Sequence, residues 1–324
     1  MEKPSALLTR FQEHLDGLDY PRKPEGLYDP VRYALSLGGK RMRPLLLLMA
    51  CNVYREDVEV AMDLACGLEL FHNYTLLHDD VMDRADIRRG MPTVHRKWDG
   101  NTAILSGDVM AFLAYRFVRR VPDDCLGDVL AVVDKAFVEV MEGQQHDMDF
   151  EKRNDVTEEE YMEMIRLKTS VLPAAALQLG AIVGGAHESD AMALYSFGLK
   201  MGLAFQLQDD LLDVYGDPKV FGKRIGGDIL CNKKTYLYIK ARLLADDECN
   251  AELDRWASYG DDKAAEKISG VTAVYDRLGV RGHCEHRIEA LFAEAMECLE
   301  GMEVPAGRLA PLKEYVAGMM NRKL

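Results

Sequence analysis

The sequence predicts an all-α protein that forms one domain over residues 1–324. Apolar residues recur at spacings of three and four, no convincing alternating strand pattern with a hairpin turn is present, and no proline falls between Pro218 and Pro305. Hydrophobic residues make up 48% of the chain, which is enough for a substantial core. Neither a change of composition nor a low-complexity linker marks a domain boundary. We therefore expect a single large helical bundle.

Apolar spacing and the residues that interrupt it locate the helices. Residues 64–76 and 192–207 carry apolar side chains on one helical face, and Thr157 followed by Glu160 is a capping box that begins another helix. Helix ends are expected at Gly38-Gly39, Gly90 with Pro92, Pro122, Gly184-Gly185, Asp217-Pro218 and Pro305. The proline-free C-terminal third is free to be helical throughout.

Charge and cysteine content narrow the class of protein. The formal net charge of −14 argues against a nucleic-acid binder that works through bulk charge. Seven scattered cysteines include no C-x-x-C pair, so neither a disulfide framework nor a zinc site is predicted. The longest apolar run, around Leu45–Cys51, is too short to cross a membrane, and residues 1–10 lack a signal-peptide core. We expect a cytoplasmic protein without stable membrane insertion.

Two D-D-x-x-D motifs, DDVMD at 79–83 and DDLLD at 209–213, each follow an apolar helical pattern. On an α-helix, positions i and i+4 lie about 40° apart around the axis, so the first and last aspartates of each motif face the same way. Like charges on one helical patch repel each other, and a divalent cation removes that cost. Carboxylate oxygens suit Mg²⁺, which also shares itself with substrate phosphates. The candidate metal ligands are Asp79, Asp80, Asp83, Asp209, Asp210 and Asp213.

A solvated acidic face is the alternative interpretation of these motifs. Three other aspartate pairs, at 123–124, 246–247 and 261–262, lie in polar stretches, and none of them completes the motif. The two complete motifs follow apolar runs, which places them at the rim of a core and favours metal binding.

Basic residues that could hold a phosphate accompany both motifs. They are Lys40, Arg41 and Arg43 after a glycine turn, Arg88 and Arg89 after the first motif, Lys168 in an apolar helix, and Lys223 and Lys233 in the Gly-rich segment 219–234. Arginine can bind phosphate oxygens with two parallel hydrogen bonds, and lysine acts as a point charge. A Walker A pattern is absent, which disfavours a P-loop nucleotide enzyme. The segment 219–234 is either a mobile flap or an ordinary surface connection.

Taken together, these residues resemble the trans-isoprenyl diphosphate synthases, the family of farnesyl and geranylgeranyl diphosphate synthases. The matching motifs appear in the family's order between about Leu37 and Leu237, and beyond Glu248 the chain matches only as helical sequence. They are GGKRMRP, FHNYTLLHDDVMDRADIRRGMPTVH, SGDVM, GQQHD, KTS, FQLQDDLLD, FGKRIGGDI and NKKTYL. The resemblance implies the isoprenoid synthase fold, an all-α bundle around a deep central cavity, and a homodimer.

The resemblance also implies a role for each matching residue. The six aspartates would hold Mg²⁺, three ions in each active site, on an allylic diphosphate. Residues that match positions gripping that diphosphate are Arg88, Lys168 and Lys223. Residues that match the isopentenyl diphosphate site are Lys40, Arg43, His72 and Arg89. Thr169, Phe205 and Gln206 match positions near the reacting carbons, Gln144 and Asp147 match a supporting GQxxD pattern, and Lys233 matches a residue that helps to close the flap. Taken alone, His72 and Phe205 would be assigned to the core.

The implied activity is a short-chain prenyl transfer. Metal ions and cations stabilise the leaving diphosphate while the allylic C–O bond of dimethylallyl or geranyl diphosphate ionises, and isopentenyl diphosphate attacks. Tyr74, with Thr75 and Phe71, lies just before the first motif and should form the floor under the growing tail. We expect farnesyl diphosphate as the product, with geranylgeranyl or a longer diphosphate as the alternative.

Two rival functions differ from this one in their sequence requirements. A class I terpene cyclase usually carries an N-D-x-x-S-x-x-x-E type second motif and needs no second diphosphate site. A non-catalytic partner subunit would be expected to have lost residues of the acidic motifs, and this chain retains all of them.

Overall fold

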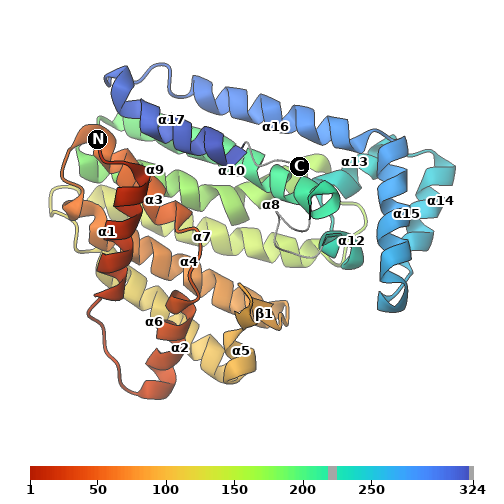
Figure 1. Cartoon of the computed structure of the whole chain (residues 1–324), viewed down its shortest axis with the longest axis horizontal. Helices are drawn as coiled ribbons and strands as arrows, with labels where there is room; N and C mark the ends of the chain where they lie inside the picture. The colour runs from red at the N-terminus through yellow and green to blue at the C-terminus, as the bar shows by residue number, and fades with distance from the viewer. Residues whose placement is uncertain (218–224, 321–324) are drawn as a thin grey trace. The chain divides into compact units, whose positions relative to one another are not determined.

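The computed structural model describes residues 1–217 and 225–320, and these residues are almost entirely helical (Figure 1), which confirms the predicted all-α class. The α-helices are α1 (Pro4–Asp16), α2 (Glu25–Ser36), α3 (Met42–Tyr54), α4 (Met62–Met82), α5 (Val94–Lys97), α6 (Gly100–Val118), α7 (Leu126–Phe150), α8 (Glu158–Ile165), α9 (Val171–Gly184), α10 (Glu188–Tyr215), α12 (Gly227–Leu230), α13 (Tyr236–Leu244), α14 (Asp247–Ala257), α15 (Ala264–Arg277), α16 (Val280–Glu297) and α17 (Ala306–Met320). Short turns are η1 (Glu59–Ala61), η2 (Arg166–Ser170), which has π geometry, and η3 (Asp261–Lys263), and the strands are β1 (Ile87–Arg88) and β2 (Met91–Pro92).

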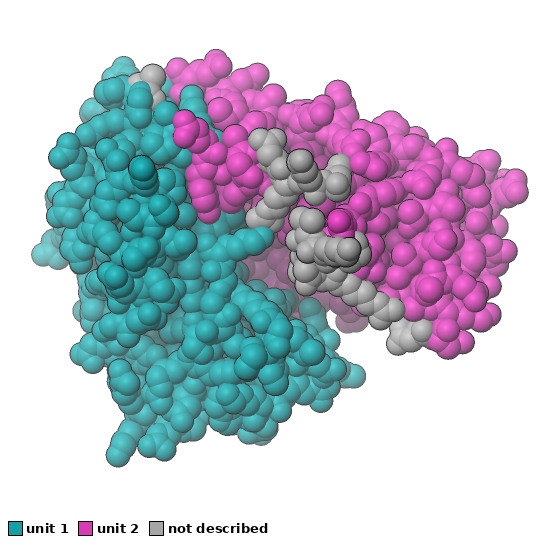
Figure 2. Space-filling view, viewed as in Figure 1, with its two compact units in different colours: residues 1–137, 175–195, 302–313 teal, residues 138–174, 196–301, 314–324 magenta. Residues whose placement is uncertain are grey.

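The chain divides into two compact units, shown in teal and magenta in Figure 2. Unit 1 comprises residues 1–137, 175–195 and 302–313, and unit 2 comprises residues 138–174, 196–301 and 314–324. The first acidic motif belongs to unit 1 and the second to unit 2. A single functional domain over the whole chain stays a prediction.

Unit 1 packs α4 closely against α6 (Figure 1). A Cβ placed on Gly67 of α4 would lie 2.8 Å from the carbonyl oxygen of Ala114 on α6. The two helices can therefore pack this closely only because residue 67 is glycine. On the same interface, His78 of α4 lies over Gly107 and its Nε2 contacts the carbonyl oxygen of Ile104 at 3.0 Å. This packing fixes the C-terminal end of α4, where the first acidic motif lies.

A short β-hairpin follows α4, although the sequence predicts no strand there. β1 and β2 pair in antiparallel fashion, and the turn between them consists of Arg89 and Gly90, both with positive φ (53° and 79°). Positive φ at both central residues is the geometry of the type I′ hairpin turn. The hairpin carries Arg88 and Arg89, and it places the Arg88 side chain beside Asp79 and Asp80 of α4.

Unit 2 has its own apolar core, built mainly from side chains of α8, α10, α13, α15 and α16. The predicted capping box is present at the start of α8: the Thr157 side chain accepts from the Glu160 backbone, and the Glu160 side chain accepts from the Thr157 backbone. The π-turn η2 lies between two helices that approach it through glycines. A Cβ on Gly143 of α7 would lie 2.3 Å from the Lys168 nitrogen, and one on Gly202 of α10 would lie 2.7 Å from the Ser170 Cα.

Among the described residues, one helical stretch, Glu158–Gly184, is long and apolar enough to cross a membrane by length and composition. The buried share of its most apolar window is 72%, as in the core helix of a globular protein.

Candidate active site

The first acidic motif lies in the last turn of α4, with Asp83 as the residue that ends the helix. Asp80 is buried (5% exposed), and the Arg88 guanidinium donates to its Oδ1 from Nε (2.8 Å) and from Nη2 (2.6 Å). Arg88 Nη2 also lies 3.6 Å from Asp79 Oδ2. Burial raises the pKa of the Asp80 carboxyl, and the Arg88 cation acts against that shift. The motif therefore combines one buried carboxylate, Asp80, with two that are more exposed, Asp79 and Asp83.

The basic residues of the GGKRMR segment have different surroundings. Arg41 is buried and donates to Glu69 Oε1 (2.6 Å) and to the Leu35 carbonyl oxygen (2.6 Å). Glu69 is 2% exposed and also accepts from Asn73 Nδ2 (2.9 Å). A buried carboxylate that is paired and hydrogen-bonded in this way fixes α3 against α4, so Arg41 is committed to the fold. No sequence motif contains Glu69 in a way that predicts this role.

Arg43, His72 and Arg89, three of the four residues predicted for isopentenyl diphosphate, come together in unit 1. Arg43 Nη1 lies 3.2 Å from His72 Nε2, which must accept because arginine only donates. Burial is the main cause that lowers the pKa of His72 well below its ordinary value, and the neighbouring arginines add to it. Burial likewise lowers the pKa of the Arg43 guanidinium to about 10. His72 is therefore neutral at pH 7 and carries its proton on Nδ1.

Arg89 lies against the glycine turn that precedes α3. Its Nη1 donates to the Gly38 carbonyl oxygen, and a Cβ on Gly39 would lie 2.7 Å from its Cζ. Lys40 is exposed on the same turn. Arg43 Nε is buried without a hydrogen-bond partner among residues 1–217 and 225–320, so it can donate to a bound anion.

The three residues predicted to set product length lie along α4. The Tyr74 ring lies between Phe71 (centroids 5.5 Å apart) and His78 (4.8 Å) and is partly buried. Phe71 is fully buried and stacks on Phe137 at 3.3 Å between centroids. The Thr75 hydroxyl donates to the His72 carbonyl oxygen at 2.8 Å. Tyr74 is thus the accessible aromatic ring, and Phe71 is the fixed one beneath it.

The second acidic motif lies in the last two turns of α10, and its middle aspartate is the buried one, as in the first motif. Asp210 is 4% exposed, and it accepts from the Tyr161 hydroxyl and from Gln206 Nε2 (3.0 Å). Burial, and next the negative charge of Asp228, raise the pKa of Asp210 to about 7. Tyr161 lies outside every sequence motif, so its contact with Asp210 could not be predicted from the sequence.

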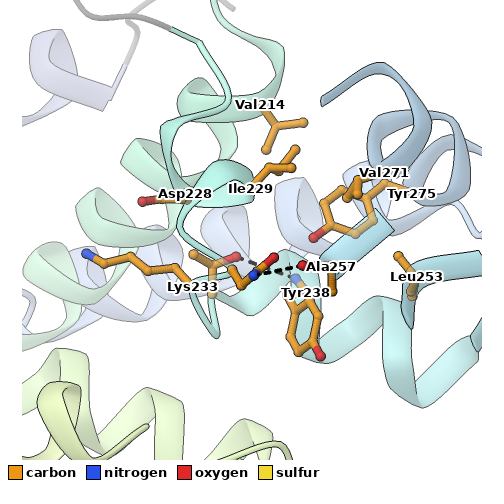
Figure 3. Close-up of a pocket in the computed structure, with 11 residues that line it drawn as sticks. Val214, Asp228, Ile229, Lys233, Tyr238, Leu253, Ala257, Val271 and Tyr275 are labelled. Atoms are coloured by element: carbon orange, nitrogen blue, oxygen red, sulfur yellow. Dashed lines mark hydrogen bonds between the residues drawn. The ribbon is translucent and has the colours of Figure 1, made fainter. Parts of the chain in front are cut away.

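Asp213 connects the second motif to the segment that follows it. Its Oδ2 accepts from the backbone N–H of Asp228 at 3.0 Å, and its carbonyl oxygen accepts from the Gly226 N–H at 2.6 Å. The Lys233 N–H donates to the Asp228 carbonyl oxygen at 2.9 Å. Figure 3 shows Asp228 and Lys233 pointing to the same side, away from the apolar side chains of the pocket. Asp228 was part of the FGKRIGGDI motif but had no assigned role. Lys223 lies outside the described residues.

The remaining predicted residues of unit 2 meet at the π-turn. Lys168 Nζ donates to Asp147 Oδ2, and the Thr169 hydroxyl donates to Gln206 Oε1 at 3.0 Å. Because π-turns widen a helix locally, they often occur at functional sites. Gln144 lies three residues before Asp147 on α7, and Phe205 directly precedes Gln206 on α10. Both side chains are partly buried.

The donor set of both motifs fits Mg²⁺. Within the described residues, no group of three or more His, Cys, Asp or Glu side chains is already drawn together around a metal position. The more exposed pairs, Asp79 with Asp83 and Asp209 with Asp213, offer carboxylates one helical turn apart. Hard oxygen donors with room for water and phosphate are what Mg²⁺ requires.

Comparisons with known proteins identify the family of the chain. The polyprenyl synthetase family model matches residues 24–275. The geranylgeranyl diphosphate synthase of Methanosarcina mazei is 44% identical over 221 residues, which cover 68% of each chain. The short chain isoprenyl diphosphate synthase of Methanothermobacter thermautotrophicus is 39% identical over 297 residues, which cover 90% of each.

Solved structures show the same fold. A geranylgeranyl pyrophosphate synthase superposes with a TM-score of 0.95 at 43% identity, covering 100% of both chains. A geranylgeranyl pyrophosphate synthase from Corynebacterium glutamicum, solved with isoprenyl diphosphate and magnesium, has a TM-score of 0.84 at 27% identity, covering 99% of this chain and 98% of that one.

Proposed function

Since the chain belongs to the polyprenyl synthetase family and is a prenyltransferase, we propose that it condenses isopentenyl diphosphate with an allylic diphosphate to give geranylgeranyl diphosphate. The observation that carries this product is the likeness, along the whole chain, to a geranylgeranyl pyrophosphate synthase. A curated relative with 44% identity bears the same name. Geranylgeranyl diphosphate, the alternative of the sequence analysis, thus replaces farnesyl diphosphate as the favoured product.

The allylic diphosphate is assigned to the acidic motifs and the cations beside them. Asp79 and Asp83 with Asp209 and Asp213 would hold Mg²⁺, while Asp80 and Asp210 keep their contacts with Arg88 and with Tyr161 and Gln206. When bound, the metal would neutralise the charge that develops on the leaving diphosphate. Three Mg²⁺ per site are proposed from the family resemblance.

The neighbouring cations would complete the allylic site. Arg88 already lies beside two aspartates of the first motif and would donate to the diphosphate. We assign the allylic diphosphate also to Lys168, which Asp147 orients, and to Lys223. Lys233 is assigned to closure over the bound diphosphate.

Isopentenyl diphosphate is assigned to the basic cluster of unit 1, which consists of Lys40, Arg43, His72 and Arg89. Arg43 Nε, which has no hydrogen-bond partner within the described part of the chain, supports this assignment, because a diphosphate oxygen would supply an acceptor. A neutral His72 adds no like charge to the arginines and can donate from Nδ1. Holding both substrates close together turns a bimolecular reaction into an effectively unimolecular one.

Bond formation needs little from the protein beyond position and electrostatics. The allylic C–O bond breaks, the isopentenyl double bond attacks the carbocation, and a proton leaves the new chain. Thr169 and Gln206, hydrogen-bonded to each other, present oxygens that would ease the positive charge, and Phe205 would do the same with its ring. The departing diphosphate is the proposed base, so no carboxylate or histidine is assigned to that step.

A homodimer remains part of the proposal. One face of α6 carries exposed apolar side chains, with Ile104 46%, Leu105 60% and Phe112 77% exposed. An apolar strip of this kind is costly in water and fits the same face of a second copy. We also propose that the protein is cytoplasmic.

The choice of allylic primer tests the proposed product. A geranylgeranyl diphosphate synthase extends dimethylallyl, geranyl and farnesyl diphosphates, whereas a farnesyl diphosphate synthase does not extend farnesyl diphosphate. We expect incorporation of labelled isopentenyl diphosphate with all three primers. Activity with dimethylallyl and geranyl diphosphates but none with farnesyl diphosphate would refute the proposed product.

A further inference from the structure

Lys267 of α15 is a buried lysine that contacts the end of α12 and the turn that follows α14. Its side chain is only 2% exposed, and its Nζ donates to the carbonyl oxygens of Leu230 (3.2 Å) and Tyr259 (3.3 Å). Burying an ammonium group is costly unless it is well hydrogen-bonded. The last carbonyls of a helix lack partners within that helix, and Leu230 is the last residue of α12.

α12 is too short to be stable without tertiary contacts, since it spans only Gly227–Leu230. Ile229 anchors it, because its buried side chain belongs to the apolar core of unit 2 and lines a pocket together with Val214 and Tyr275 (Figure 3). At the other end, Gly226 has a φ of +80°, and a Cβ there would lie 2.7 Å from Ile268, the neighbour of Lys267 on α15. α15 therefore contacts both ends of α12.

α12 also contacts the second acidic motif through its first turn. The backbone N–H of Asp228 donates to Asp213 Oδ2 at 3.0 Å, and the Asp228 carbonyl oxygen accepts from the Lys233 N–H at 2.9 Å. The position of α12 thus determines where the Asp228 carboxylate and the Lys233 ammonium lie. Both side chains point away from the apolar pocket (Figure 3).

We propose that Lys267 is a positioning residue for the prenyl transfer: by binding the Leu230 carbonyl oxygen it holds α12 and so places Asp228 and Lys233 beside the second acidic motif. The inference rests on the proposed role of that motif. Lys267 is only 2% exposed, so we assign it no contact with either substrate.

Three variants of the full-length enzyme test the inference by kinetics. K267M keeps the length of the side chain and removes the ammonium, K267R keeps a donor, and K200M removes a lysine that pairs with Glu294 elsewhere in unit 2. In K267M we expect the KM for the allylic diphosphate and the half-saturating Mg²⁺ concentration to rise roughly tenfold, as for other supporting residues of metal sites. The KM for isopentenyl diphosphate should stay within about twofold. K267R should restore much of the loss, and K200M should behave as wild type.

Hydrogen exchange, measured without metal or substrate, gives a second readout. In K267M, peptides covering residues 225–235 should exchange several-fold faster, while peptides from α16 should match the wild type. A rise spread evenly over unit 2, or unchanged allylic and Mg²⁺ dependence, would overturn the inference. Should K267M fail to fold, K267Q keeps a neutral donor and is measured instead. A wild-type enzyme without product would refute the proposed function, whereas the exchange result would still decide the role of Lys267.

Discussion

Replacing Tyr74 with alanine is expected to lengthen the product by one five-carbon unit. The ring of Tyr74 is partly buried and lies between Phe71 and His78 on α4. Alanine removes the ring and leaves Phe71 as the next barrier, three residues or about 4.5 Å further along the helix axis. An extended five-carbon unit, with four C–C bonds of about 1.5 Å, spans roughly 5 Å. The space gained therefore matches one unit, from C20 to C25.

Phe71 should stop further growth because it cannot move aside. It is 1% exposed and stacks on Phe137 with centroids 3.3 Å apart. Loss of the half-buried Tyr74 ring costs about 2 kcal/mol of stability, less than the cost of emptying a fully buried aromatic site, so the variant should stay folded.

The assay is chromatography of dephosphorylated products formed from dimethylallyl and isopentenyl diphosphates. Tyr74→Phe is the matched control, since it keeps the ring and should keep the C20 product. An unchanged product from Tyr74→Ala, with Tyr74→Phe equal to wild type, would place the floor elsewhere and refute the reasoning.

Four further predictions concern metal binding, pH, packing and assembly. Asp209→Ala should lower kcat/KM by more than about 100-fold in a Mg²⁺ assay, whereas Asp123→Ala, in a pair outside the motifs, should not; equal effects would contradict the metal assignment. Because His72 is neutral in the native state and its pKa there is lowered, the unfolded chain binds the extra proton below about pH 6.5. Stability should therefore fall by up to about 1.4 kcal/mol per pH unit as the pH drops, and His72→Gln should flatten that slope in urea titrations. Gly143→Ala should cost about 1–3 kcal/mol, measured by urea unfolding, since its Cβ would meet the π-turn backbone at 2.3 Å; a neutral result would mean that the turn yields. Phe112→Lys should shift the protein toward a monomer in sedimentation velocity, and an unchanged dimer would exclude that face of α6.

Elements with a strong periodic signal could be predicted from the sequence. The apolar spacing before each acidic motif gave the helices that carry them, and the Thr157–Glu160 pair gave the start of α8. The hairpin after α4 could not be predicted, because strands of two residues show no alternation and its turn consists of Arg89 and Gly90. The π-turn at Lys168 depends on the approach of two other helices, which no local pattern records.

Long-range partners decide the roles that the sequence could not separate. Arg41 and Arg43 lie two residues apart in the same basic segment, yet Arg41 pairs with buried Glu69 while Arg43 meets His72. Likewise, the motif spacing does not separate the six predicted metal ligands, whereas the structure shows that Asp80 and Asp210 are the buried ones. These distinctions arise from side chains far away in the sequence.

Product analysis of the wild-type enzyme tests the central claim most directly. The full-length protein is incubated with dimethylallyl diphosphate, an excess of isopentenyl diphosphate and Mg²⁺, and the dephosphorylated alcohols are identified by mass spectrometry. We expect geranylgeraniol as the main product and no product when EDTA replaces Mg²⁺. Farnesol as the final product, or equal activity with EDTA, would contradict the proposed function.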